Sequence, residues 1–428
     1  MSNSVRLLAA LTALVISLVF APATAHADPH NDGQHWVGSW MAAPTDALNG
    51  ADANLVPILN IADQTFRVVV TPHRGGNEIR VQLTNRKRPV PLDISAATAA
   101  VAGNGASVQS PVVALTFGGR RSVTIPAGAD VLSDPVRLTV KQWQRLAVSV
   151  SVRGPAMFVT QHMNGNATSY YTLPGAGDRT RSRSAADFPL STTVVPIVNR
   201  VDVRAPRSTT TIVALGDSIT DGYVSDNYIV VPQAHRGVVD RNVRYPDYLQ
   251  RRLDRAGIAR PVVNAGISGN RVIADGFVPL FGDAATHRLY HDVIAVPGVT
   301  DALLLEGIND LGVPIGANPD QVIAGYKNII ARLHARGIRV HLATMLPASD
   351  ALFDGYIAPL ANGARIQINQ WIRSQRLSDS VIDFDRAVRD RHNPNILAPQ
   401  YSGPDRLHPS PAGYKKMADA IDLDTLRH

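Results

Sequence analysis

Cysteine is absent from this sequence of 428 residues. Its absence excludes disulfides, thiolate metal ligands, a cysteine nucleophile and a lipidated cysteine anchor. Aromatic residues are also scarce, at 6% of the chain, and the sequence shows no internal repeat or low-complexity tract. Hydrophobic residues make up 45% and charged residues 18%, a composition typical of globular rather than disordered proteins. A chain of this length exceeds one compact core of ordinary size, so two domains are expected.

The first residues have the features of an export signal. Arg6 supplies a positive charge, residues 7–20 form an apolar run, and Ala25 and Ala27 are small residues at the cleavage positions. A membrane anchor is the alternative, but this run of 14 residues is shorter than the ~18 needed to span a bilayer. We therefore expect a signal peptide over residues 1–27, cleavage after Ala27, and a secreted protein without stable membrane insertion.

The chain carries an excess of basic residues. Its formal net charge is +7, and loss of the signal segment removes Arg6 and no acidic residue, which leaves +6. Such a charge favours a weak attraction to anionic cell-surface polymers, although solubility alone is the simpler interpretation. The sequence has no nucleic-acid-binding motif, so no nucleic-acid partner is expected.

The first half of the chain has the pattern of an antiparallel β domain. Short alternating or β-branched runs at residues 66–71, 78–84, 122–125, 136–140 and 146–152 are separated by Gly, Pro and Asn. This pattern predicts an all-β sandwich, jelly-roll-like, over residues 32–205. Residues 175–207 are expected to lead into the second domain, with 192–198 as a possible last strand. Trp36 and Trp40 are expected to pack in the core or at a domain interface, with a sugar-binding platform as the alternative.

The second half alternates between strands and helices. Strands are predicted at residues 210–215, 261–264, 301–305, 338–345 and 381–384, and helices at 245–256, 319–336, 363–375 and 411–422. Repeated strand–helix units imply a parallel sheet with helices on both faces, and hence an α/β domain over residues 206–428.

Four predicted loops of this domain hold residues suited to acyl transfer, at the sheet edge where functional groups collect. Ser218 follows the first strand, and a serine hydroxyl becomes a nucleophile when a base takes its proton. Gly269 can bring a backbone N–H close to an oxyanion. Asn309 can donate its side-chain N–H to the same atom, although helix capping is its alternative role. Asp405 lies three residues before His408, which allows the carboxylate to orient the imidazole as a base.

In this order and spacing, the four loops resemble the conserved blocks of the SGNH or GDSL hydrolase superfamily, over about residues 208–425. The resemblance implies a flavodoxin-like, three-layer domain and a serine esterase or acylhydrolase that needs no metal or organic cofactor. It makes Ser218 the nucleophile and first oxyanion donor, Gly269 and Asn309 the other donors, His408 the base and Asp405 its orienting carboxylate.

Two features depart from the pattern of the superfamily. Ile219 stands where its name motif has leucine, and the loop 224–244 is long and is expected to shape the substrate entrance. The segment 36–44 is similar to the opening of secreted bacterial members that have a β-rich N-terminal domain.

Substrate and partners are less strongly indicated. Few aromatics and no long amphipathic lid favour short acyl esters of polar or carbohydrate substrates, either small molecules or glycans. Longer-chain lipid esters, transfer to an acceptor alcohol, and a non-enzymatic glycan-binding module are the alternatives. His287, His291 and Asp292 could suggest a metal site, but their spacing fits no standard one and we interpret them as helix-surface residues.

Overall fold

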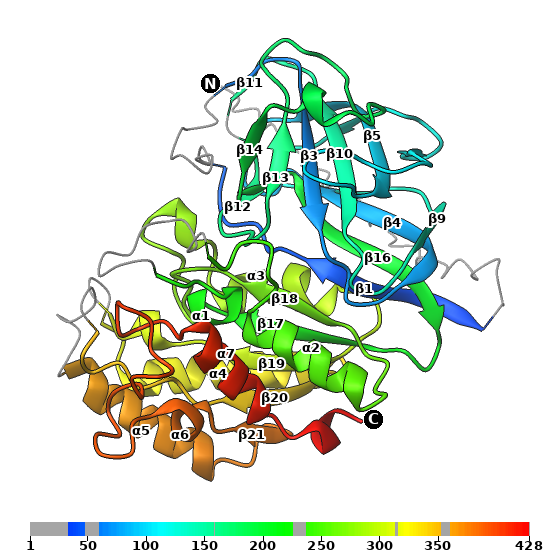
Figure 1. Cartoon of the computed structure of the whole chain (residues 1–428). Helices are drawn as coiled ribbons and strands as arrows, with labels where there is room; N and C mark the ends of the chain where they lie inside the picture. The colour runs from blue at the N-terminus through cyan, green and yellow to red at the C-terminus, as the bar shows by residue number, and fades with distance from the viewer. Residues whose placement is uncertain are drawn as a thin grey trace, which may run out of the picture.

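The computed structural model describes residues 33–47, 60–157, 159–225, 237–312, 316–351 and 360–427. The predicted signal peptide, residues 1–27, lies outside these ranges. Figure 1 shows a strand-rich N-terminal part above an α/β part, with the end of one N-terminal sheet directed toward the second part. None of the helices in the described ranges has both the length and the apolar character needed to cross a membrane.

Two antiparallel sheets form the N-terminal domain. The first has the order β1 (Gln34–Met41), β16 (Val198–Pro206), β4 (Gly76–Thr84) and β8 (Asp130–Leu132), and β9 (Val136–Val140) also pairs with β4. The second has the order β14 (Leu190–Thr192), β13 (Ser169–Tyr171), β3 (Gln64–Val70), β10 (Leu146–Val152), β5 (Leu92–Val101) and β6 (Val113–Leu115), and β7 (Val123–Ile125) also pairs with β5.

A shared core holds the two sheets together. Alternate residues of β4, such as Ile79 and Val81, and alternate residues of β3, such as Phe66 and Val68, are buried in one hydrophobic cluster. This is the period-two pattern of strands that turn one side chain in two toward a common interior. The predicted β-sandwich is confirmed.

The last strand of this domain differs from the prediction. Strand β16 runs over residues 198–206, later than the suggested 192–198, and it occupies the middle of the first sheet between β1 and β4. Its Arg200 and Asp202 are buried and pair at 2.8 Å, and the Arg204 guanidinium lies 5.7 Å from the Trp36 ring centre. Asp202 also pairs with Arg80 of β4 at 2.8 Å, and these neutralised charges gave the strand the composition of a linker.

The second domain contains a five-stranded parallel sheet. Its order is β18 (Val262–Gly266), β17 (Thr211–Gly216), β19 (Val299–Leu305), β20 (Arg339–Ala343) and β21 (Ser380–Ile382). Counted in chain order, this is 2-1-3-4-5, the flavodoxin-like arrangement, whose functional switch point lies between the first and third strands. The predicted parallel α/β fold is confirmed.

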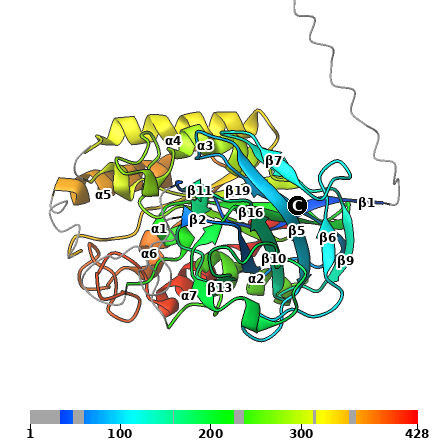
Figure 2. The same cartoon turned by 90° about the horizontal axis from the view of Figure 1, so that it is seen from above.

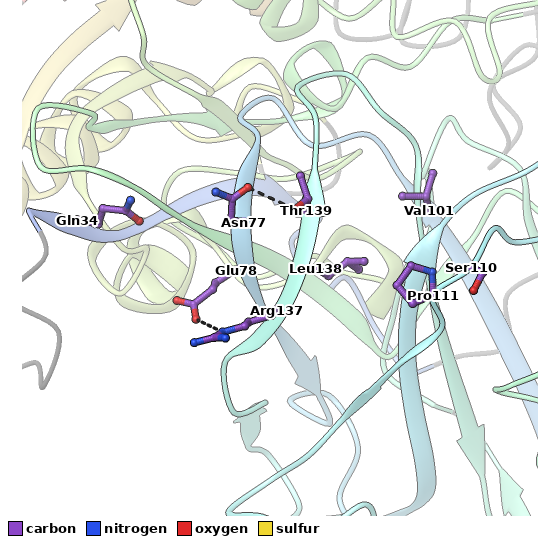
Figure 3. Close-up of a pocket in the computed structure, with 9 residues that line it drawn as sticks. All are labelled: Gln34, Asn77, Glu78, Val101, Ser110, Pro111, Arg137, Leu138 and Thr139. Carbon is purple, nitrogen blue, oxygen red and sulfur yellow. Dashed lines mark hydrogen bonds and ion pairs between the residues drawn. The ribbon is translucent and has the colours of Figure 1, made fainter.

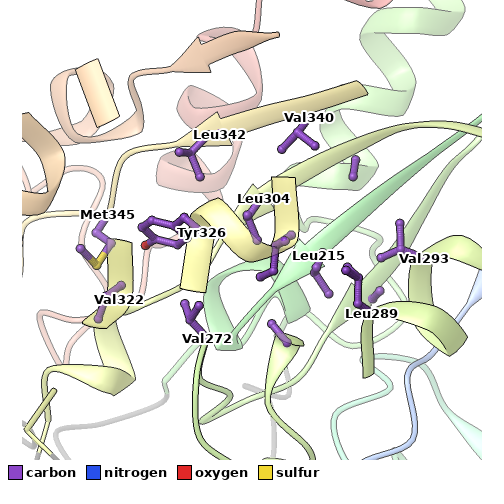
Figure 4. Close-up of a cluster of buried hydrophobic side chains, with 14 of the residues drawn as sticks. Leu215, Val272, Leu289, Val293, Leu304, Val322, Tyr326, Val340, Leu342 and Met345 are labelled. Carbon is purple, nitrogen blue, oxygen red and sulfur yellow. The ribbon is translucent and has the colours of Figure 1, made fainter. Parts of the chain in front are cut away.

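Helices cover both faces of this sheet. Val213 and Leu215 of β17 face a core shared with α3 (Ala285–Leu289), α4 (Pro319–His334) and α5 (Leu360–Ser374), part of which Figure 4 shows. Ile212 and Ala214 face the opposite core, with α2 (Tyr245–Arg255), α6 (Phe384–Val388) and α7 (Pro411–Asp419). Figure 2 shows α3 and α4 on one side of the sheet and α2 and α7 on the other.

Strand β1 packs directly on the second domain. The Gly38 N–H donates to the carbonyl of Pro297 at 3.0 Å, and a side chain at Gly38 would come within 2.8 Å of Val296. Elsewhere on this interface, the Trp143 indole N–H donates to Asp254 at 2.8 Å. Trp40 lines a cavity of about 30 Å³ between the domains, so it has the interface position expected for packing.

Candidate active site

The turn after β17 places Ser218 at the switch point of the sheet. Asp217 precedes the short helix α1 (Ser218–Asp221) and caps it, because its side chain accepts the Ile219 N–H at 2.9 Å. Gly216 lies so close to β19 that a Cβ there would meet the Leu305 carbonyl oxygen at 2.2 Å. The strand therefore ends in a tight turn that only glycine permits, with the serine at the start of the helix.

Ser218, His408 and Asp405 form one hydrogen-bonded series. The Ser218 Oγ and His408 Nε2 are 2.8 Å apart, and the His408 Nδ1 and Asp405 Oδ2 are 2.7 Å apart. The other oxygen of Asp405 accepts the backbone N–H groups of Leu407 and His408 at 3.1 and 3.0 Å. Both carboxylate oxygens are thus fixed, and the structure brings together the three side chains that the sequence singled out.

The environment favours a charged Asp405 and a fixed imidazole. Burial alone would raise the pKa of the Asp405 carboxyl, but the hydrogen bonds and charge of His408 together with the two backbone N–H groups lower it below its ordinary value. The Tyr223 ring packs against the His408 ring with centres 4.6 Å apart. Tyr223 is itself held by the Tyr414 hydroxyl, which donates to its carbonyl at 2.6 Å.

Three N–H donors surround the same edge of the sheet. The backbone N–H groups of Ser218 and Gly269 have no hydrogen-bond acceptor among the described residues. Asn309 lies in the 3₁₀ turn Ile308–Asp310, where Gly307 and not Asn309 is the N-cap. The Asn309 Nδ2 donates one N–H to the Asn270 carbonyl at 2.9 Å, and a side-chain amide has a second N–H available for a ligand.

A pair of phenylalanines borders the Gly269 donor. Gly269 has φ +78°, and a Cβ there would lie 2.1 Å from the Phe281 ring, so both conformation and space require glycine. Phe281 packs edge to face with Phe277 at 5.3 Å between centres, and the Phe277 side chain is exposed. An apolar surface formed by Phe277 and Phe281 therefore adjoins this side of the site.

Three buried carboxyl groups lie close to the turn that holds Ser218. Burial raises the pKa of Asp217 to about 7 and that of Asp310 to about 6, even though backbone N–H groups bonded to each oppose the change. Burial and the neighbouring Asp217 raise the pKa of Glu306 well above its ordinary value. Neither carboxyl oxygen of Glu306 has a hydrogen-bond partner among the described residues. Burial without a partner therefore disfavours the charged form of Glu306.

The structure corrects one interpretation of the sequence. His287 is an exposed residue that pairs with Asp275 at 2.7 Å, and His291 is also exposed, but Asp292 is buried. Asp292 bonds to Arg86 at 2.8 Å and to Arg288 at 3.2 Å. It was mistaken for a surface residue because Arg86, which helps to neutralise it, comes from a distant part of the chain. Within the described residues, no cluster of three or more His, Asp or Glu is arranged to hold a metal ion.

Of the loop 224–244, residues 226–236 lie outside the described ranges, so its role at the substrate entrance stays a prediction. Its last residues contact the N-terminal domain, since Asp240 accepts both the N–H and the hydroxyl of Thr168 at 2.8 and 2.6 Å. Sequence patterns also did not reveal that His162 of the N-terminal domain contacts Asp221, three residues after Ser218. The position of Asp221 on the same helical turn as Ser218 was the available signal.

Comparison with known proteins agrees with this geometry. Residues 214–416 match the model of the GDSL-like lipase/acylhydrolase family. The chain therefore contains a GDSL-like lipase/acylhydrolase domain, that of a serine esterase or hydrolase. No curated protein matches the chain.

Solved structures similar to the chain cover about half of it. The inhibitor-bound aryl esterase of M. smegmatis has 14% identity and a TM-score of 0.41, over 49% of this chain and 95% of that one. A GDSL-like lipase from Bacteroides thetaiotaomicron has 20% identity and a TM-score of 0.35, over 51% and 88%. A carbohydrate acetylesterase from Sinorhizobium meliloti has 12% identity and a TM-score of 0.36, over 50% and 96%.

Proposed function

We propose that this chain is a secreted serine carboxylic-ester hydrolase that forms an acyl-enzyme on Ser218. The observation that carries the proposal is the series Asp405–His408–Ser218, with both links at hydrogen-bonding distance. A base held by a carboxylate and aligned on a serine hydroxyl is the arrangement that activates the hydroxyl for acyl transfer.

In the proposed mechanism, the Ser218 Oγ attacks the ester carbonyl carbon while His408 Nε2 takes the hydroxyl proton. The carbonyl oxygen becomes an oxyanion that accepts from the N–H groups of Ser218 and Gly269 and from the Asn309 amide. Collapse of this intermediate breaks the bond to the alcohol oxygen, which receives the proton from His408. Water then attacks the acyl-enzyme, His408 takes its proton, and collapse releases the acid and returns the proton to Ser218. Each proton that His408 takes is given back in the next step, so the proposed cycle returns Ser218 and His408 to their starting forms.

For the substrate, we propose short acyl esters of polar or carbohydrate alcohols. The scarcity of aromatic residues in the chain supports this choice over long-chain lipid esters. Initial rates on esters graded from acetyl to dodecanoyl, and on acetylated sugars, test it, with Ser218→Ala as the matched control. We expect the highest kcat/KM on acetyl or propionyl esters and no turnover by the variant above background. A maximum at octanoyl or longer would refute the short-acyl proposal and support a lipid acylhydrolase; transfer to an added alcohol faster than acid release would identify an acyltransferase.

A glycan-binding role for the N-terminal domain has little support. One of its pockets, of about 670 Å³ beside β4 and β9, is drawn in Figure 3, and the residues that line it include no aromatic side chain on which a sugar ring could stack. Trp36 does not offer such a platform either, because the guanidinium of Arg80 lies 4.5 Å from its ring centre. Both observations favour packing over carbohydrate recognition.

Secretion is tested by determining the N-terminal residue of the protein recovered outside the cytoplasm. If the chain is exported and cleaved after Ala27, protein recovered outside the cytoplasm begins at Asp28. An uncut Met1 terminus on protein that stays with the cells would contradict the proposal.

A further inference from the structure

The loop 267–270, which carries the proposed donor Gly269, is bonded to two buried series of hydrogen bonds and ion pairs between side chains. We call these series the first and the second chain of contacts. Both chains begin at a cationic side chain of the N-terminal domain and end on a residue next to Gly269. The sequence places those cations at least 100 residues before the loop, at His162 and Arg86.

The first chain runs through the helix of the nucleophile. His162 Nε2 lies 3.1 Å from Asp221 Oδ1, and the other oxygen of Asp221 accepts the Ser268 hydroxyl at 2.8 Å. His162 and Asp221 are both fully enclosed. Ser268 immediately precedes Gly269, so this chain fixes one side of the loop relative to Ser218.

The contacts of His162 favour an imidazolium that donates from both ring nitrogens. Its Nδ1 lies 2.7 Å from the Ala43 carbonyl, and its Nε2 faces the Asp221 carboxylate and the Asn164 carbonyl. Every partner is an acceptor, and only the imidazolium has an N–H on both nitrogens. Burial works against this charge, as does the nearby Arg244, but the Asp221 carboxylate raises the pKa of His162 above its ordinary value.

The second chain reaches the loop from the other side. Arg86, which also bonds to Asp130, donates to Asp292 at 2.8 Å, and Asp292 accepts from Arg288 at 3.2 Å. The Arg288 Nε donates to the Asn270 side-chain oxygen at 2.9 Å.

Arg288 also connects the loop to strands β17 and β18 by hydrogen bonds. Its guanidinium donates to the carbonyls of Gly216 and Ala265 at 3.0 and 2.6 Å, at the ends of β17 and β18. Asn270 in turn accepts the Asn309 amide on its backbone carbonyl. The second chain therefore sets the spacing of the nucleophile strand, the loop and the Asn309 donor together.

We propose that His162 and Arg86 are positioning residues through which the N-terminal domain holds the loop 267–270 in its catalytic geometry. The inference rests on the proposed function, because it concerns donors to an oxyanion. The N-terminal domain is then a structural part of the active site rather than a separate binding module. Misplacement of a catalytic donor by ~1 Å can cost ~100-fold in rate, so loss of either anchor affects the transition state more than substrate binding.

The test compares His162→Gln with His73→Gln in the full mature chain. His73 is a matched control: it is a buried histidine of the N-terminal domain, its Nδ1 lies 2.6 Å from the Val262 carbonyl, and its Nε2 lies 3.3 Å from Asp247. These contacts cross the same interface but end at the start of β18 and in the first turn of α2, outside the loop 267–270. On an acetyl ester, we expect kcat of His162→Gln to fall about tenfold to hundredfold with KM changed less than about threefold. His73→Gln is expected to keep both constants near wild type.

For the second chain, Arg86→Met is compared with Arg80→Met. Arg80 is paired with Asp202 at 2.8 Å wholly inside the N-terminal domain. The same fall in kcat at steady KM is expected for Arg86→Met and not for Arg80→Met. The melting temperature of each variant separates loss of positioning from loss of fold.

A double-mutant cycle with Ser268→Ala tests the first chain without disturbing the interface. If His162 acts through Asp221 and Ser268, the variant with both changes loses no more kcat than the worse single variant. Additive losses, or equal losses of kcat in His162→Gln and His73→Gln, would overturn the inference. An inactive wild-type chain would instead refute the proposed function, so the two failures are distinguishable.

Discussion

The replacement Asp405→Asn is expected to abolish most of the activity by changing the tautomer of His408. The two oxygens of Asp405 have different partners: one accepts the backbone N–H groups of Leu407 and His408, and the other faces His408 Nδ1. An asparagine keeps its oxygen toward the two backbone donors, which directs its NH₂ group at Nδ1. Nδ1 must then accept, and the ring proton moves to Nε2.

That proton blocks the base, because Nε2 is the atom that lies 2.8 Å from Ser218 Oγ and takes its proton in the proposed mechanism. A wrong tautomer of this kind costs ~10⁴ in kcat, or about 5.5 kcal/mol at ~1.36 kcal/mol per factor of ten. KM is expected to change little, because the replacement leaves the groups that surround a bound ester in place.

The assay is initial-rate hydrolysis of an acetyl ester at neutral pH, with the melting temperature measured alongside. Asp390→Asn is the matched control, since Asp390 also accepts the N–H groups of the residues two and three positions later, at 2.8 and 2.9 Å, but these hydrogen bonds do not involve His408. We expect Asp390→Asn to retain full activity. A folded Asp405→Asn enzyme with kcat within about tenfold of wild type would refute this account of Asp405.

Three further replacements test other parts of the site. Asn309→Ala removes a proposed oxyanion donor, so kcat should fall ~10²–10³-fold in the same assay, and an unchanged kcat would exclude this role. Gly269→Ala places a Cβ 2.1 Å from the Phe281 ring at φ +78°, so the urea midpoint should drop, with the backbone alone costing ~1–2 kcal/mol; an unchanged midpoint would contradict the packing. Asp217→Asn keeps the Ile219 N–H bond but cannot ionise. Because burial raises the folded pKa of Asp217 to about 7, from an ordinary 3.8, ionisation destabilises the fold. The free energy of unfolding of the wild type should therefore fall relative to this variant as pH rises from about 4 to 7, by up to ~1.4 kcal/mol per pH unit; parallel curves would contradict the shift.

Local sequence signals were sufficient to predict the strands of the second domain and the edge of the sheet at which its candidate site residues lie. Its strands are short β-branched runs, and Ser218, Gly269 and Asn309 follow three of them directly, so parallel pairing alone brings these residues to one edge. The strand order was expected only from the family resemblance, and the hydrogen-bond distances depend on tertiary packing and were not predictable. The pairing of Asp405 with His408 was expected because three residues separate them.

Contacts between distant charged residues could not be predicted in the same way. Strand β16 had the composition of a linker because its Asp202 is neutralised by Arg80, more than 100 residues earlier, as well as by Arg200 in the same strand. Asp292 was interpreted as a helix-surface residue because Arg86, which neutralises it, lies more than 200 residues earlier in the sequence. The positioning role of His162 could not be predicted for the same reason, since it depends on a contact with Asp221, which is distant in sequence. In each case a buried charge needs a partner that sequence proximity does not reveal.

The most direct measurement of the central claim is active-site labelling with a fluorophosphonate, followed by peptide mapping. Our account predicts one adduct on Ser218, inside the segment 211–222, with labelling slowed strongly in His408→Ala, because the base that activates the hydroxyl is gone. An adduct on any other residue, or equally fast labelling of His408→Ala, would contradict the assignment of Ser218 as a nucleophile activated by His408.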